Sequence, residues 1–132
     1  RRSSAGKYCA NSLTVGSAIR FAEYDLNLDR VLSYRNRQLE MPCVLTADAA
    51  SSRTTNKLVH QIRHAFSILA GHKIGEAGSI NPHVTLVWDR FSVPEHFVQP
   101  IELPVREVAL VHSYVGRSRY EMLGRWNLVP RQ

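Results

Sequence analysis

Hydrophobic and polar positions along the chain switch between helical and strand spacing. Over residues 10–22 the apolar side chains recur every three or four positions, which predicts an amphipathic helix. Residues 24–29 alternate between apolar and polar, and residues 43–47 form a short apolar run, so both predict strands. Residues 56–70 carry a second apolar stripe at helical spacing, which predicts a helix that closes at the following glycine.

The second half of the chain has mostly strand character. Residues 83–89 alternate, so that His83, Thr85 and Val87 are expected on one face of a strand. Residues 105–113 and 120–128 flank a short connection that contains a glycine, which predicts a β-hairpin. These strands are expected to build antiparallel sheet.

Three polar segments predict connections between these elements. Residues 34–38 are basic and end before Pro42, which is typical of an exposed loop. Residues 51–55 are serine- and threonine-rich and supply candidate capping hydroxyls for the helix after them. Residues 90–104 contain three prolines, and His96 within them is expected on a loop surface.

Composition narrows the class of protein. A chain of 132 residues predicts a single domain over residues 1–132, and no apolar run is long enough to cross a bilayer. The formal net charge of +6 favours anionic partners such as nucleotides or RNA. The two cysteines, Cys9 and Cys43, form no metal-binding or dense disulfide pattern, which predicts a cytoplasmic protein while leaving a disulfide between them open.

His83 and Thr85 are the strongest candidates for chemistry. On one face of a strand, a histidine can exchange a proton near neutral pH while the hydroxyl two residues away donates a hydrogen bond to an anionic oxygen. Phosphate is the natural ligand for this pair. The alternative is a strand whose two polar side chains serve no ligand, because an isolated His-x-Thr is a short and common pattern.

A metal site at His60 and His64 is the competing chemical interpretation. Their spacing of four residues on a helix suits zinc, but they lie opposite the expected apolar stripe. The residue after His60 is Gln61, where the zinc-protease motif has its glutamate. A solvated helix face is therefore the favoured interpretation, and no metal or other cofactor is predicted.

Several blocks in order resemble the bacterial 2'-5' RNA ligase family of the 2H phosphoesterase superfamily, from about residue 6 to residue 128. The central block is Pro82-His83-Val84-Thr85-Leu86. It is preceded by the strand-like residues 24–34 and followed by residues 105–113 and 119–128, all in the order of that family. Several blocks in order are more specific than the tripeptide alone.

The resemblance implies a LigT-like α+β fold, with two lobes of antiparallel sheet and flanking helices. It also implies metal-independent acid-base chemistry on 2',3'-cyclic phosphates or 2'-5' linkages, at RNA termini or small cyclic nucleotides. His83 would be a catalytic proton carrier and Thr85 a phosphate clamp. Arg90, Arg35 and Arg119 are candidate substrate-binding residues, chosen for charge and position.

The first His-x-Thr/Ser motif of that family is expected just before Gly6, where this sequence has Arg1-Arg2-Ser3-Ser4-Ala5. Three explanations are open: a longer natural protein, a nucleotide- or RNA-binding module without turnover, or a histidine from elsewhere, including a swapped partner. A missing N-terminal strand would also leave an unpaired sheet edge, which predicts a homodimer or aggregation.

Overall fold

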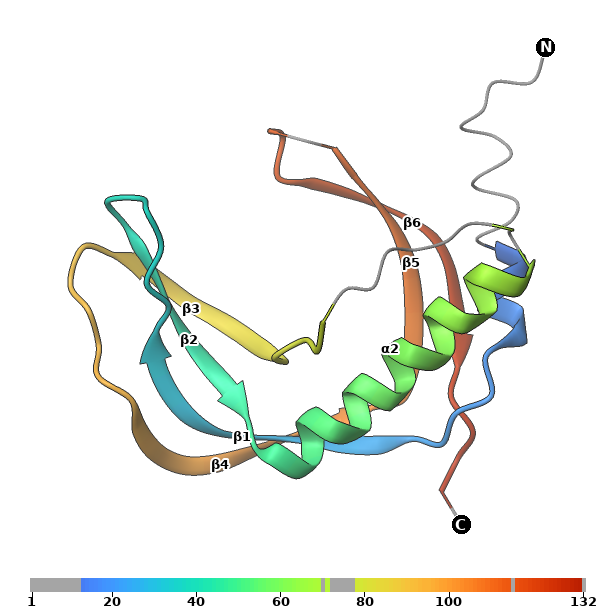
Figure 1. Ribbon diagram of the computed structural model, residues 1–132, viewed down its shortest axis with the longest axis horizontal. Coiled ribbons are helices and arrows are strands. Elements are labelled where there is room, and N and C mark those ends of the chain that lie inside the picture. Colours follow the sequence, from blue (N-terminus) through green and yellow to red (C-terminus); the bar gives the residue numbers. More distant parts are fainter. Residues whose placement is uncertain (1–12, 70, 72–77, 115, 132) are drawn as a thin grey trace. The chain divides into compact units, whose positions relative to one another are not determined.

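The computed structural model describes residues 13–69, 71, 78–114 and 116–131 (Figure 1). The chain divides into two compact units. The sheet unit is formed by Asp25–Asn56 and Ser79–Pro104; the hairpin unit draws on Arg1–Tyr24, Lys57–Gly78 and Val105–Gln132. The elements in chain order are β1 (Tyr24–Ser33), β2 (Met41–Ala47), α2 (Ala49–Leu69), β3 (His83–Asp89), β4 (His96–Val105), β5 (Glu107–Tyr114) and β6 (Arg119–Asn127).

The sheet unit is built on four strands in the order β3-β2-β1-β4. The strands predicted over residues 24–29, 43–47 and 83–89 are confirmed as β1, β2 and β3. Strand β2 is central and buried, with Val44 fully enclosed, and it pairs antiparallel with both β1 and β3. Strand β3 lies at one edge of the sheet and all its side chains are exposed. The predicted homodimer through a sheet edge stays a prediction.

A bulge in β3 corrects one detail of the predicted alternation. Val44 pairs with Thr85, whereas the neighbouring Cys43 pairs with Val87, so Leu86 is the extra residue. Because Cys43 and Val44 point to opposite faces of β2, Val87 lies on the face opposite Thr85. The expectation that Val87 shares a face with His83 is therefore wrong. His83 and Thr85 do share a face.

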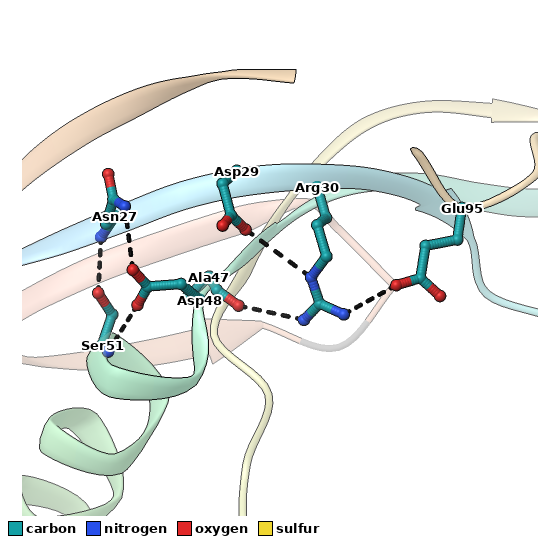
Figure 2. A network of polar contacts seen from close by, with 7 residues as sticks. All are labelled: Asn27, Asp29, Arg30, Ala47, Asp48, Ser51 and Glu95. Atoms are coloured by element: carbon teal, nitrogen blue, oxygen red, sulfur yellow. Dashed lines mark hydrogen bonds and ion pairs between the residues drawn. The ribbon is translucent and has the colours of Figure 1, made fainter. Parts of the chain in front are cut away.

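Helix α2 begins at Ala49, seven positions before the predicted start at Asn56. Asp48 is its N-cap, because its Oδ1 accepts a hydrogen bond of 2.8 Å from the backbone N–H of Ser51 (Figure 2). The hydroxyls of Thr54 and Thr55 donate to carbonyls one turn earlier, at 3.1 and 2.9 Å. Bonds of this kind satisfy hydroxyls within a helix, so the polar stretch predicted as a connection is helical.

Strand β4 replaces the predicted connection over residues 96–104. Pro100 and Pro104 lie within it, at the second edge of the sheet. A proline lacks the N–H that an inner strand must donate, but an edge strand has one side that needs no partner. His96 begins this strand and is exposed, with its Nδ1 2.9 Å from the carbonyl oxygen of Pro94.

The hairpin unit contains β5 and β6 as an antiparallel pair, which confirms the predicted hairpin. The helix predicted over residues 10–22 is helical over residues 13–18; its start lies outside the described residues. The predicted end is wrong, because Phe21 and Glu23 pair through backbone hydrogen bonds with Val129. Ile19, Leu58 and Leu128 are the buried centre of this unit.

The architecture is α+β with antiparallel sheets, as predicted. The assignment of residues 1–132 to one domain stays a prediction. Of the two cysteines, Cys43 is a free and buried thiol, while Cys9 lies outside the described residues. Among the helices that the structure describes, none has the length and hydrophobicity of a membrane span.

The N-cap of α2 gives the first testable prediction. The pKa of Asp48 lies below its ordinary value of 3.8, first because Asn27 donates a hydrogen bond to its carboxylate and then because the Ser51 backbone does. We expect Asp48→Ala to lower the free energy of unfolding by about 1 kcal/mol at pH 7, measured by urea unfolding. Asp48→Ser, which keeps a capping oxygen, is the matched control.

The same carboxylate predicts a pH effect. A pKa lowered by folding means that ionised Asp48 stabilises the protein above about pH 4, and that this stabilisation is lost as the pH falls through the folded-state pKa. The difference between wild type and Asp48→Ser should therefore shrink in acid. A constant difference from pH 7 to pH 2 would contradict the assigned role.

Candidate functional site

Strand register places one set of chemically useful side chains on a single face of the sheet unit. His83 of β3 pairs with Thr46 of β2, and Thr46 pairs with Arg30 of β1. Two residues further along both strands, Thr85 pairs with Val44. Residues directly opposite in antiparallel strands point to the same side, so His83, Thr85, Thr46 and Arg30 share what we call the site face.

The imidazole of His83 is held by a backbone carbonyl just before β3. Its Nδ1 lies 2.6 Å from the carbonyl oxygen of Asn81, and the side chain is exposed. A carbonyl oxygen can only accept, so Nδ1 carries the hydrogen and donates. The second ring nitrogen, Nε2, is then available to accept a proton in the neutral ring or donate one in the charged ring.

Tyr34 packs against His83. The two ring centroids are 5.1 Å apart and the rings meet edge to face at 79°. Tyr34 directly follows β1, and its backbone N–H bonds to the Pro42 carbonyl. Together with the Asn81 carbonyl, the tyrosine restricts the orientation of the imidazole.

Arg30 is the cation of the site face, and it is already engaged (Figure 2). One guanidinium nitrogen, Nη1, lies 2.9 Å from Glu95, and Nη2 donates to the Ala47 carbonyl at 3.3 Å. Nε lies 3.7 Å from Asp29. Two carboxylates thus oppose one guanidinium, which leaves no excess positive charge at this point.

Thr46 lies between Arg30 and His83 and is 5% exposed. Its hydroxyl oxygen has no hydrogen-bond partner among the residues that the structure describes. An unpaired buried hydroxyl costs roughly 1–3 kcal/mol, so such a group is uncommon in a folded protein.

The three predicted arginines are not among the four residues of the site face. Arg35 is exposed on the β1–β2 connection, directly after Tyr34. Arg90 is exposed after the end of β3 remote from His83. Arg119 belongs to the hairpin unit, where its guanidinium carbon lies 5.5 Å from the centre of the Tyr114 ring. Phosphate binding by each of them stays a prediction.

His60 and His64 lie one turn apart on the exposed side of α2. Their rings are nearly parallel, with centroids 6.5 Å apart. Within the described parts of the chain, no three His, Cys, Asp or Glu side chains form a group that could hold a metal ion. Both side chains are exposed to solvent. The absence of a metal at these histidines stays a prediction.

Sequence reasoning missed Arg30, Thr46 and Tyr34. A second bulge explains the first omission: Leu28 pairs with Ala47 while Arg30 pairs with Thr46, so Leu28 and Arg30 point to opposite faces. Simple alternation from Leu28 would have placed Arg30 on the wrong face. Thr46 and Tyr34 are brought to the site by strand pairing. Alternation along the predicted strand could have suggested Thr46, but not its neighbours.

Comparison with solved structures supports this architecture. A structure described as a phosphoesterase matches with a TM-score of 0.60 and 24% identity, covering 96% of this chain and 71% of that chain. Escherichia coli LigT complexed with 3'-AMP matches with a TM-score of 0.58, 24% identity and the same coverage. Its apo form matches with a TM-score of 0.59 and 26% identity, covering 96% and 70%.

No protein-family model matches the sequence, and neither does any curated protein. Likeness at this identity is carried by the arrangement of strands and helices rather than by sequence. It extends over nearly the whole chain and includes both units. The chain therefore has a LigT-like fold, which is the fold implied by the resemblance of its sequence to the 2'-5' RNA ligase family.

Proposed function

We propose that this protein acts on phosphodiesters at RNA termini or in small 2',3'-cyclic nucleotides, by acid-base chemistry that uses no metal. The observation that carries the proposal is the orientation of His83: Nδ1 is fixed by the Asn81 carbonyl, and Thr85 shares its face. The fold adds support, since LigT structures have been solved with 3'-AMP and with ATP. The net charge of +6 favours such anionic ligands.

The proposed hydrolysis has two proton transfers. A water oxygen forms a bond to phosphorus while the bond from phosphorus to one ribose oxygen breaks. One proton leaves the water and one is delivered to the departing ribose oxygen. Nε2 of His83 carries one of these protons, and the hydroxyl of Thr85 donates a hydrogen bond to a phosphate oxygen on which charge accumulates.

A second group must carry the other proton. His83-Val84-Thr85 is the single His-x-Thr/Ser motif in the 132 residues. In the 2'-5' RNA ligase family, which the sequence resembles, the other histidine belongs to a motif at the position just before Gly6. The activity assay therefore pairs this chain with a form extended upstream to its first in-frame methionine.

This single motif also favours a second candidate function. A chain with one proton carrier and one phosphate clamp can bind a nucleotide phosphate without cleaving it. The second candidate is thus a nucleotide- or RNA-binding module that uses the same site face. Under both candidate functions we propose that the protein forms a homodimer and is cytoplasmic.

Hydrolysis of adenosine 2',3'-cyclic monophosphate in excess chelator tests the first proposal. We expect His83→Ala to lower the turnover of the active form at least roughly 100-fold, because it removes a general acid or base. His96→Ala is the matched control: His96 is also exposed, starts a strand and contacts the carbonyl two residues before it. Wild-type turnover by His83→Ala would overturn the assignment, as would loss of activity in chelator.

Binding separates the two candidates. Under the second, neither form of the chain turns the cyclic nucleotide over, yet both bind RNA with an affinity that falls steeply as salt is raised. Thr85→Val should weaken binding, whereas Thr54→Val, on α2, should not. Salt-independent binding, or equal effects of the two variants, would contradict this candidate.

A further inference from the structure

A polar cavity opens within the sheet unit, beside His83. Its volume is about 280 Å³, and the residues lining it include Arg30, Tyr34, Thr46, Ser52, Asn81 and Pro82. This volume is several times that of a water molecule and approaches the lower bound of small-molecule sites. The cavity is large enough for one chemical group of a ligand.

The cavity adjoins the proposed phosphate position. Thr46 is the direct neighbour of His83 across the sheet, and the Tyr34 ring contacts the His83 ring. Asn81 and Pro82 lead directly into β3. A ligand whose phosphate is held by His83 and Thr85 therefore places its adjoining atoms at this cavity.

The charge balance disfavours a second phosphate there. Of the described residues that line the cavity, Arg30 alone is charged. Its guanidinium is engaged by Glu95 at 2.9 Å and lies 3.7 Å from Asp29 (Figure 2). An entering phosphate would meet two carboxylates for one guanidinium, so electrostatics oppose it.

The lining instead suits an uncharged group that forms hydrogen bonds. Among the lining residues, Tyr34 and Ser52 carry hydroxyls and Asn81 carries a carboxamide. Each of these groups both donates and accepts. The lining is therefore polar and can form hydrogen bonds with an uncharged ligand group.

We propose that this cavity binds the uncharged nucleoside part of a nucleotide, by hydrogen bonds to its ribose hydroxyls or to the edge of its base. The inference rests on the proposed function, because it takes the phosphate to be held by His83 and Thr85. It assigns substrate selection to Asn81 and Ser52. It predicts a preference for nucleotides without further phosphates beside the reacting one.

Calorimetric titration with three probes tests the proposal: 3'-AMP, 1-O-methylribose 3-phosphate and inorganic phosphate. We expect Asn81→Ala and Ser52→Ala each to weaken 3'-AMP binding roughly two- to tenfold, the effect of one lost hydrogen bond, and to leave inorganic phosphate binding unchanged. An equal loss for the methylribose probe assigns the contact to the sugar. A loss confined to 3'-AMP assigns it to the base.

The His83 and cavity variants separate the phosphate site from the nucleoside cavity. His83→Ala should weaken all three probes, and its failure to do so overturns the proposed function itself. If His83→Ala acts but the cavity variants bind 3'-AMP like wild type, the cavity proposal alone is wrong. Equal weakening of inorganic phosphate by the cavity variants, or no binding of any probe by wild type, also overturns it.

Discussion

The pairing of β2 with its two neighbours is the constraint on which the site depends. Because β2 is central and Val44 is fully buried, its register is fixed by burial. That register places Thr46 between Arg30 and His83, and Val44 beside Thr85. A slip of one residue would send every one of these side chains to the other face, so packing and chemistry depend on the same pairing.

Electrostatics then divide the site face into two parts. Around His83, the exposed imidazole and the Thr85 hydroxyl offer a proton carrier and a donor for a phosphate. Around Arg30, the carboxylates of Glu95 and Asp29 offset the guanidinium, so the adjacent cavity is polar without being cationic. A nucleotide has the same division into an anionic phosphate and an uncharged nucleoside.

Local periodicity was sufficient to predict the strands β1, β2 and β3, the β5–β6 hairpin, and the shared face of His83 and Thr85. It failed where tertiary context decides. Two bulges change the face to which the following side chains point. Simple alternation therefore did not identify Arg30 as a site residue and assigned Val87 to the wrong face. The serine- and threonine-rich stretch is helical because the helix begins earlier, at the N-cap Asp48. The proline-rich segment is a strand because it lies at an edge of the sheet. None of these effects has a reliable signature in a single sequence.

We propose that His83 contacts the phosphate of a nucleotide. The most direct test is an NMR titration that follows the imidazole signals of the six histidines as 3'-AMP is added. We expect the His83 signals to shift in a saturable manner, while those of His60 and His64, stacked on the exposed side of α2, stay in place. Saturable shifts at those helix histidines with none at His83 would contradict the account.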